Sequence, residues 1–185
     1  MKLNQNTKKI ITIQNPREVK ILRSKTKEFV FTSSGEVKIG GEILSKSELN
    51  LLILEMRKLM REANGVGLSA NQIGLSWNMF VAEVPDNDGI LKLYAIFNPR
   101  LEKVARAKKV IFEEGCLSVP KKYGRIERFS EVKLSGLNKL GKPVKIKAWG
   151  LLAHVFQHEV DHLNGKLFID GALEIFDQKS EKNGK

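Results

Sequence analysis

The sequence has few of the residues that build disulfides or metal sites, and few tryptophans and tyrosines: one cysteine, three histidines, two tryptophans and two tyrosines in 185 residues. One cysteine cannot form an internal disulfide bond, which fits a reducing compartment and leaves the thiol free for metal or redox chemistry. No apolar run approaches the length of a membrane span, and residues 10–13 are too short for the core of a secretory signal. We therefore expect a cytoplasmic protein with no membrane association.

Acidic residues are also scarce beside basic ones, 21 against 32, which gives a net charge of +11. Such an excess is typical of surfaces that meet nucleic acids or other polyanions. The basic residues are dispersed along the chain, mainly over 100–109, 121–128 and 133–147, and are not interleaved with aromatic residues in a recognisable nucleic-acid-binding motif. We interpret them as a solvated surface with weak, nonspecific attraction for RNA and no sequence-specific nucleic-acid binding.

All of the histidines, His154, His158 and His162, lie in one segment, LLAHVFQHEVDHLNG at 151–165. Its apolar spacing and the closing Asn164-Gly165 predict a helix. Residues four apart share a helix face, so His158 and His162 can converge on one metal ion while Glu159 reaches a water bound to it. This is the H-E-x-x-H arrangement of metal hydrolases.

The third metal ligand is not given by this motif. His154 lies about 12 Å along a straight helix from His162, too far for both to bind one ion through bonds of about 2 Å. No histidine follows Gly165, which excludes a metzincin pattern. Glu174 is a possible downstream carboxylate, and the only cysteine, Cys116, is the better candidate.

The order of the remaining elements predicts an α+β fold. The pattern Ser45-Lys46-Ser47-Glu48 is a capping box, and the apolar stripe that follows predicts a helix ending at Gly65. Turn clusters and alternating residues predict a hairpin over 28–44 and strands over 78–84, 91–97, 108–113, 125–135 and 144–149. We expect a single domain over 1–185, with antiparallel β-sheets packed around a central helix that carries the H-E-x-x-H motif. Three outer segments are predicted as well: an extended N-terminal arm over 1–26, a short helix over 172–176 and a frayed tail over 177–185.

Three segments, GVGLSANQ at 65–72, EGCLS at 114–118 and QHEVDH at 157–162, together closely resemble the peptide deformylase family. The resemblance extends from about residue 45 to 170. It implies a metal hydrolase that removes the formyl group from the N-terminal formylmethionine of newly made proteins and releases formate. It also implies that Cys116 joins His158 and His162 as the third ligand, with a fourth position open for water.

The resemblance further implies roles for the residues around the metal. A metal-bound water attacks the formyl carbon, Glu159 acts as general base and then acid, and Gln72 and the Leu117 N–H stabilise the oxyanion. The backbone at Val66 and Gly67 would bind the substrate as an added strand. The pocket for the methionine side chain, with its rim, would involve Val66, Phe112, Gly115, Leu151, His154 and Val155. Ser69 stands where alanine is common in the family.

The cofactor implied by the resemblance is one divalent ion per chain, Fe(II) in cells, with Zn(II) or Ni(II) possible in a purified sample. The partners implied are N-formylmethionyl nascent peptides, with weak ribosome association, and we expect a monomer from a bacterium, an organelle or a phage. Two other interpretations stay open at the level of sequence. One is an H-E-x-x-H zinc endopeptidase, and the other is a basic ribosome- or RNA-associated protein with a non-catalytic metal site.

Overall fold

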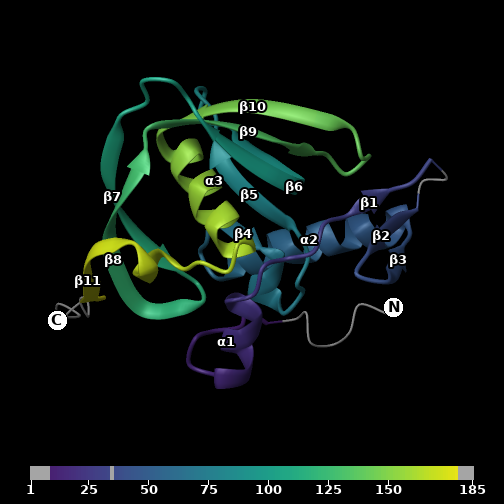
Figure 1. Ribbon diagram of the computed structural model, residues 1–185, viewed down its shortest axis with the longest axis horizontal. Coiled ribbons are helices and arrows are strands. Elements are labelled where there is room, and N and C mark those ends of the chain that lie inside the picture. Colours follow the sequence, from purple (N-terminus) through teal and green to yellow (C-terminus); the bar gives the residue numbers. More distant parts are fainter. Residues whose placement is uncertain (1–8, 34–35, 179–185) are drawn as a thin grey trace.

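The computed structural model describes residues 9–33 and 36–178 and contains helices and antiparallel sheets (Figure 1). A small sheet has the order β1-β2-β3, a five-stranded sheet has the order β10-β9-β6-β5-β4, and a third has the order β11-β8-β7. All pairings between these strands are antiparallel, as the sequence predicts. Among the described residues, no helix combines the length and the apolar character that a membrane crossing needs.

The first part of the chain contains a helix that the sequence interpretation missed. The stretch 1–26 is not extended throughout, because α1 spans Pro16–Leu22. Asn15 caps it by accepting a hydrogen bond from the Arg17 N–H, and Pro16 takes the first helical position, where its missing N–H costs nothing. Residues 1–8 of the expected arm lie outside the described residues. The expected hairpin follows as β1 (Val30–Phe31), β2 (Val37–Ile39) and β3 (Glu42–Leu44).

Helix α2 (Lys46–Glu62) begins where the capping box predicts. The Ser45 hydroxyl accepts from the Glu48 N–H, and the Glu48 carboxylate accepts from the Ser45 N–H at 2.8 Å. The helix ends before Gly65, with Ala63 as its C-cap. Its stripe Leu49, Leu52, Ile53, Met56 and Met60 is buried against one side of the five-stranded sheet.

The glycine-rich segment forms β4 (Gly67–Ser69) and a 3-10 turn, η2 (Ala70–Ile73). The next strands are β5 (Met79–Pro85), β6 (Leu91–Lys103) and β7 (Lys109–Cys116). The strand expected over 125–135 is in fact two, β8 (Val119–Phe129) and β9 (Glu131–Leu137), which belong to different sheets. At Ser130 the backbone changes partners, because its N–H bonds to Lys108 and its carbonyl accepts from Gly150.

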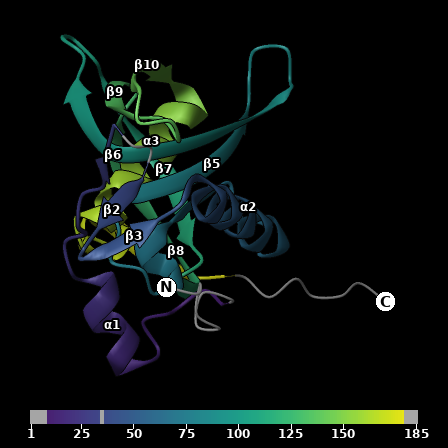
Figure 2. The same cartoon turned by 90° about the vertical axis from the view of Figure 1, so that its right-hand side faces the viewer.

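Strand β10 (Pro143–Trp149) leads directly into α3 (Gly150–Leu163), which carries the histidines. Helix α3 packs on the side of the five-stranded sheet opposite α2, against Phe80, Ala82, Val132 and Leu134 (Figure 2). It also contacts β8 of the third sheet, so residues of α3 lie between two sheets.

The chain after α3 departs from the prediction. A short 3-10 turn, η3 (Phe168–Asp170), is followed by β11 (Ala172–Asp177), which is a strand and not a helix. It pairs with β8 from Ala172↔Ile126 to Asp177↔Lys122, and the N–H of Gln178 bonds to Lys121. Residues 177 and 178 are therefore held in place and not frayed, and 179–185 lie outside the described residues.

Candidate metal centre

Three side chains that are distant in sequence converge between α3 and β7. The Sγ atom of Cys116 lies 3.1 Å from Nε2 of His162, which lies 3.1 Å from Nε2 of His158. The three potential ligand atoms all lie within 4.8 Å of one another. Tetrahedral coordination with bonds of about 2.1 Å to nitrogen and 2.3 Å to sulfur puts donors about 3.4–3.6 Å apart. The donor set and its spacing therefore fit a single divalent ion.

The other two candidate ligands considered from the sequence lie elsewhere. His154 bonds through Nε2 to Oε1 of Glu114 at 2.7 Å. Glu174, on β11, forms an ion pair with Arg125 at 3.2 Å. Neither is part of the group formed by Cys116, His158 and His162.

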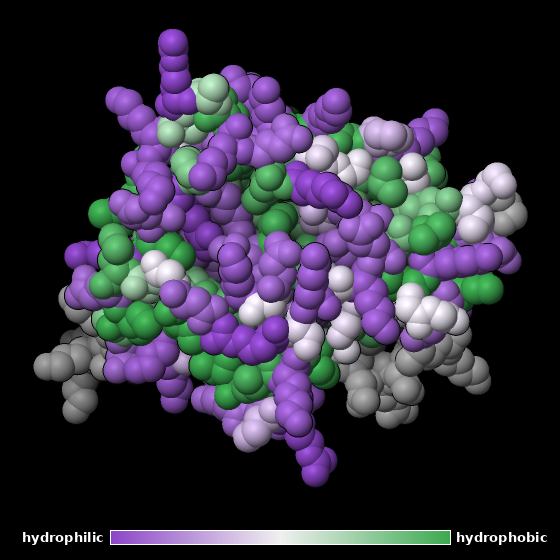
Figure 3. Space-filling model, in the orientation of Figure 1, coloured by the Kyte–Doolittle hydropathy of each residue, from purple (hydrophilic) through white to green (hydrophobic). Residues whose placement is uncertain are grey.

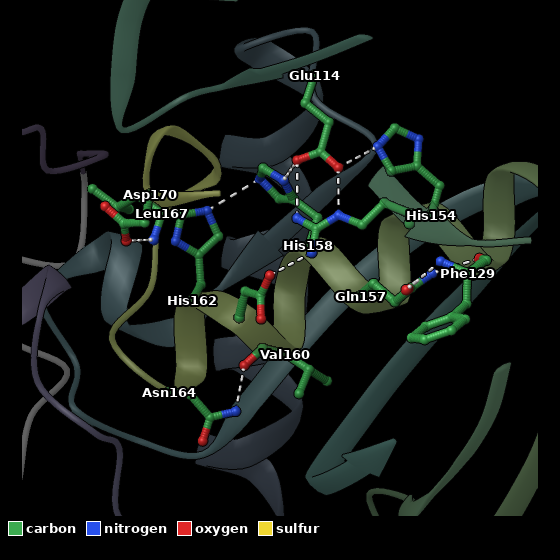
Figure 4. A network of polar contacts seen from close by, with 12 residues as sticks. Glu114, Phe129, His154, Gln157, His158, Val160, His162, Asn164, Leu167 and Asp170 are labelled. Carbon is green, nitrogen blue, oxygen red and sulfur yellow. Dashed lines mark hydrogen bonds and ion pairs between the residues drawn. The ribbon is translucent and has the colours of Figure 1, made fainter. Parts of the chain in front are cut away.

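Glu114 contacts two of the three histidines and fixes their orientation. Its carboxylate lies between His154 and His158 and contacts Nδ1 of His158 at 2.8 Å (Figure 4). This bond leaves Nε2 of His158 free to face the other two ligand atoms. Burial by itself would raise the pKa of Glu114, but the hydrogen bonds from His154, His158 and Arg128 outweigh it and hold that pKa well below its usual range.

Arg128, on β8, was not identified from the sequence. Its guanidinium bonds to both oxygens of Glu114, at 2.7 and 3.1 Å, and also to Asp161 on α3. Arg128 is 7% exposed and Glu114 is 2% exposed, so this ion pair between two strands of the third sheet is buried. The bond from Arg128 to Asp161 links that sheet to α3. No local signal points to Arg128, because the contact depends on how β7, β8 and α3 pack.

Glu159 is buried beside the ligand group. Its Oε2 atom accepts a hydrogen bond from the Ser69 hydroxyl at 2.6 Å. Burial raises the pKa of Glu159 to about 7, although the nearby His158 and the bond from Ser69 oppose this shift. Ser69 therefore has a direct contact with the expected base, which its place in the family motif did not indicate.

Gly67 makes room for this carboxylate. A Cβ atom on Gly67 would lie 2.8 Å from Cδ of Glu159 and closer still to Oε1. The sequence interpretation assigned this glycine to a close approach of the substrate backbone. The structure adds a second reason, which is the space that the Glu159 side chain occupies.

Gln72 points its amide nitrogen towards the same centre. Its Nε2 atom lies 3.2 Å from the Ser118 hydroxyl and 3.6 Å from Sγ of Cys116. Its Oε1 atom accepts from the Ser69 N–H at 2.9 Å, which fixes the orientation of the amide. A donor held in this way is pre-oriented for charge that develops near the cysteine.

A cleft of about 630 Å³ opens onto these residues. Of the side chains expected around the substrate, Phe112 does not line it; its ring stacks on His154, with centroids 4.3 Å apart. Beyond the expected set, Lys121, Lys122 and Tyr123 form part of the wall. The expected residues that do line the cleft are Val66, Gly67, Gln72, Gly115, Leu117, Leu151, His154 and Val155.

A thiol, two imidazoles and a buried carboxylate at the base of a cleft define the site of a metal-dependent hydrolase. The family model described as polypeptide deformylase matches residues 7–175. A peptide deformylase of Halothermothrix orenii is 45% identical over 132 residues, which are 71% of this chain and 82% of that protein. The chain belongs to the polypeptide deformylase family, and the resemblance found in its sequence is confirmed.

Solved structures agree with this assignment. A probable peptide deformylase from Synechococcus phage S-SSM7 has a TM-score of 0.73 at 34% identity, and the match covers 88% of this chain and 98% of that one. The peptide deformylase of Thermotoga maritima has a TM-score of 0.72 at 32% identity, over 90% and 97% of the two chains. The protein is therefore an enzyme of a hydrolase family with an established fold.

Proposed function

We propose that this enzyme removes the formyl group from N-terminal formylmethionine of newly made proteins, with one divalent ion held by Cys116, His158 and His162. The observation that carries the proposal is the convergence of these ligand atoms beside the buried Glu159. When bound, such an ion supplies an activated water and polarises the formyl carbonyl. We infer Fe(II) in cells, because the set of one thiolate and two imidazoles accepts it, and Zn(II) or Ni(II) as replacements in purified protein.

Glu159 moves the proton in this proposal. Its carboxylate accepts a proton from the attacking water and later delivers it to the nitrogen of the leaving amine. The products are formate and a free N-terminus. The bond from Ser69 holds one carboxylate oxygen in place, which limits the positions that the other can take.

The negative charge on the former carbonyl oxygen requires donors that are already oriented. We assign this task to Nε2 of Gln72 and to the N–H of Leu117. Gln72 supports the assignment because its carbonyl end is fixed by Ser69. Removal of one such donor typically costs about 100- to 1000-fold in kcat.

The substrate backbone is expected along β4, which is an edge strand that begins at Gly67, directly after Val66. An extended peptide can pair with such an edge through main-chain hydrogen bonds. The methionine side chain then enters the cleft between Val66, Leu151 and Val155, next to His154 and Gly115. Phe112 supports this pocket from behind His154.

The same proposal treats the chain as one domain with α3 as its central helix. Both sheets that contribute site residues contact α3, which fits this role. We propose that the enzyme acts as a monomer on N-formylmethionyl nascent peptides and associates weakly with the ribosome.

Formate release from formyl-Met-Ala-Ser by anaerobically prepared protein tests this function. We expect turnover by the native chain, a decrease of at least 1000-fold in Glu159→Ala with metal content retained, and no change in Glu62→Ala, an exposed control. Equal rates in the native and Glu159→Ala proteins would refute the assigned base. Cleavage of an internal peptide bond without formate release would favour the endopeptidase interpretation.

A further inference from the structure

The positive charge that is dispersed in the sequence is concentrated in the structure. Residues 100–109 and 131–149 contain ten lysines and arginines and two glutamates, so they carry +8 of the net +11 of the chain. These segments are neighbours in space, because β6 pairs with β9 and β9 pairs with β10. The sheet therefore gathers charges that no single segment displays.

Strand alternation places part of this charge on one side of the sheet. Val132, Leu134 and Ala148 are buried against α3, so the residues between them point away from it. Directly paired residues share a face, which puts Lys147, Lys133 and Glu102 in one row. The next row holds Lys145, Ser135 and Arg100.

We define the basic face as Arg100, Lys133, Lys145 and Lys147, together with Lys139 and Lys142 in the turn between β9 and β10. All six are exposed. Lys147 pairs with Glu131 at 2.6 Å and Arg100 with Glu28 at 3.2 Å. For the four others the described part of the chain provides no ion pair within 4.0 Å.

The surroundings of these lysines indicate a solvated, polar contact surface. Hydrophilic side chains project along the upper margin of Figure 3, over β9 and β10. A hollow of about 370 Å³ lies among these residues; its lining consists of Glu102, Lys133, Leu134, Ser135, Lys145, Ile146 and Lys147. Ser135 and Glu102 occupy the outward positions between the cations. Two exposed apolar side chains border them, Trp149 at the end of β10 and Leu140 in the turn.

We propose that the basic face binds the phosphate backbone of double-helical RNA without regard to sequence. Unpaired lysines on an exposed surface gain free energy from a polyanion mainly by releasing its counterions. The choice of RNA as the polyanion rests on the proposed function, because a nascent chain is carried by the ribosome. The metal-centre cleft lies on the α3 side of the sheet, so the bound RNA would leave it open.

A pair of matched variants tests the proposal. The first replaces Lys133, Lys142 and Lys145 by glutamine, and the control replaces Lys25, Lys38 and Lys46 by glutamine. The control lysines are also exposed and have no ion pair within the described residues. Both variants carry three fewer positive charges and keep every ion pair named above. The probe is a fluorescent 20-base-pair RNA of mixed sequence, titrated at several KCl concentrations.

We expect the native protein to bind with log K falling linearly with log[KCl], and the control to lie within about twofold of it. The basic-face variant should bind at least tenfold more weakly at low salt, and its slope should be shallower by about one for each phosphate that it no longer neutralises. Equal weakening in both variants would overturn the proposal, because net charge alone would then explain binding. Binding to vesicles with 30% anionic lipid, and not to RNA, would overturn it in favour of a membrane surface.

Formate release from formyl-Met-Ala-Ser and thermal melting are measured on the same three proteins. Both should be unchanged in the basic-face variant, since its residues lie on the far side of the sheet from the cleft. Absence of formate release by the native protein would refute the proposed function without affecting the RNA result. The two proposals can therefore fail separately.

Discussion

Replacing Gly67 by alanine should separate catalysis from metal binding. The added Cβ would lie 2.8 Å from Cδ of Glu159, whereas non-bonded carbons sit at about 3.5–4.0 Å. Gly67 is fixed in β4 by its pairing with Ala82, so the carboxyl group must withdraw by about 1 Å. A misplacement of that size can reduce the rate by about 100-fold.

The assay is formate release with metal content measured on the same samples. We expect Gly67→Ala to reduce kcat about 100-fold, by the estimate for a 1 Å displacement, while retaining one metal ion per chain. Gly171→Ala is the matched control, because its Cβ would meet nothing closer than 3.5 Å and its φ is −120°. A native kcat with only a raised KM would refute the reasoning, since Gly67 would then serve the substrate and not Glu159.

Three further predictions follow from individual contacts. Ser69→Ala removes the hydroxyl that bonds to Glu159. It should lower kcat about tenfold with KM unchanged, because a hydrogen bond to a charged group is worth about 1.5 kcal/mol. An unchanged kcat would exclude a positioning role for Ser69. Chelation of the metal should abolish formate release, and addition of Fe(II) or Ni(II) should restore it. The Cys116→Ala variant should retain less than a tenth of the metal that the native protein binds. Full metal retention by that variant would contradict the proposed ligand set. The hydrogen bond from Arg61, assisted by Arg57 and opposed by burial, lowers the pKa of Glu83. Its stabilisation is thus present above the unfolded pKa of about 4.3 and is lost as the pH falls through the folded pKa. Glu83→Gln should therefore cost about 1–3 kcal/mol in urea unfolding at pH 7, and the difference from the native protein should shrink below about pH 4; a difference independent of pH would contradict this.

Local signals predicted much of the fold. The capping box at Ser45 and the stop at Asn164-Gly165 set helix ends because they satisfy backbone groups within a few residues. Where a strand ends depends on distant partners, which is why the local sequence predicts one strand over 125–135 although Ser130 divides it between two sheets. Residues 172–176 form a strand because β8 offers them an edge, a fact that their own sequence does not contain.

The contacts around the site also divide into those predicted from the sequence and those that depend on tertiary packing. The His158–Glu159–His162 spacing places these residues through helix geometry alone. The single cysteine, Cys116, is already the better candidate for the third ligand, and the family resemblance supports it and adds Gln72 and Leu117. The bonds from Arg128 to Asp161 and from Ser69 to Glu159 come from packing between elements far apart in the chain.

By itself, the sequence determined the motif, the number of positive charges and the family, because each is a property of residue identity and local spacing. Only the tertiary structure decided which polar groups surround the candidate metal centre and that scattered lysines share one face of a sheet. The physical reason is that hydrogen bonds and electrostatic fields act over a few ångströms of space, and the folded backbone alone brings distant residues within that range.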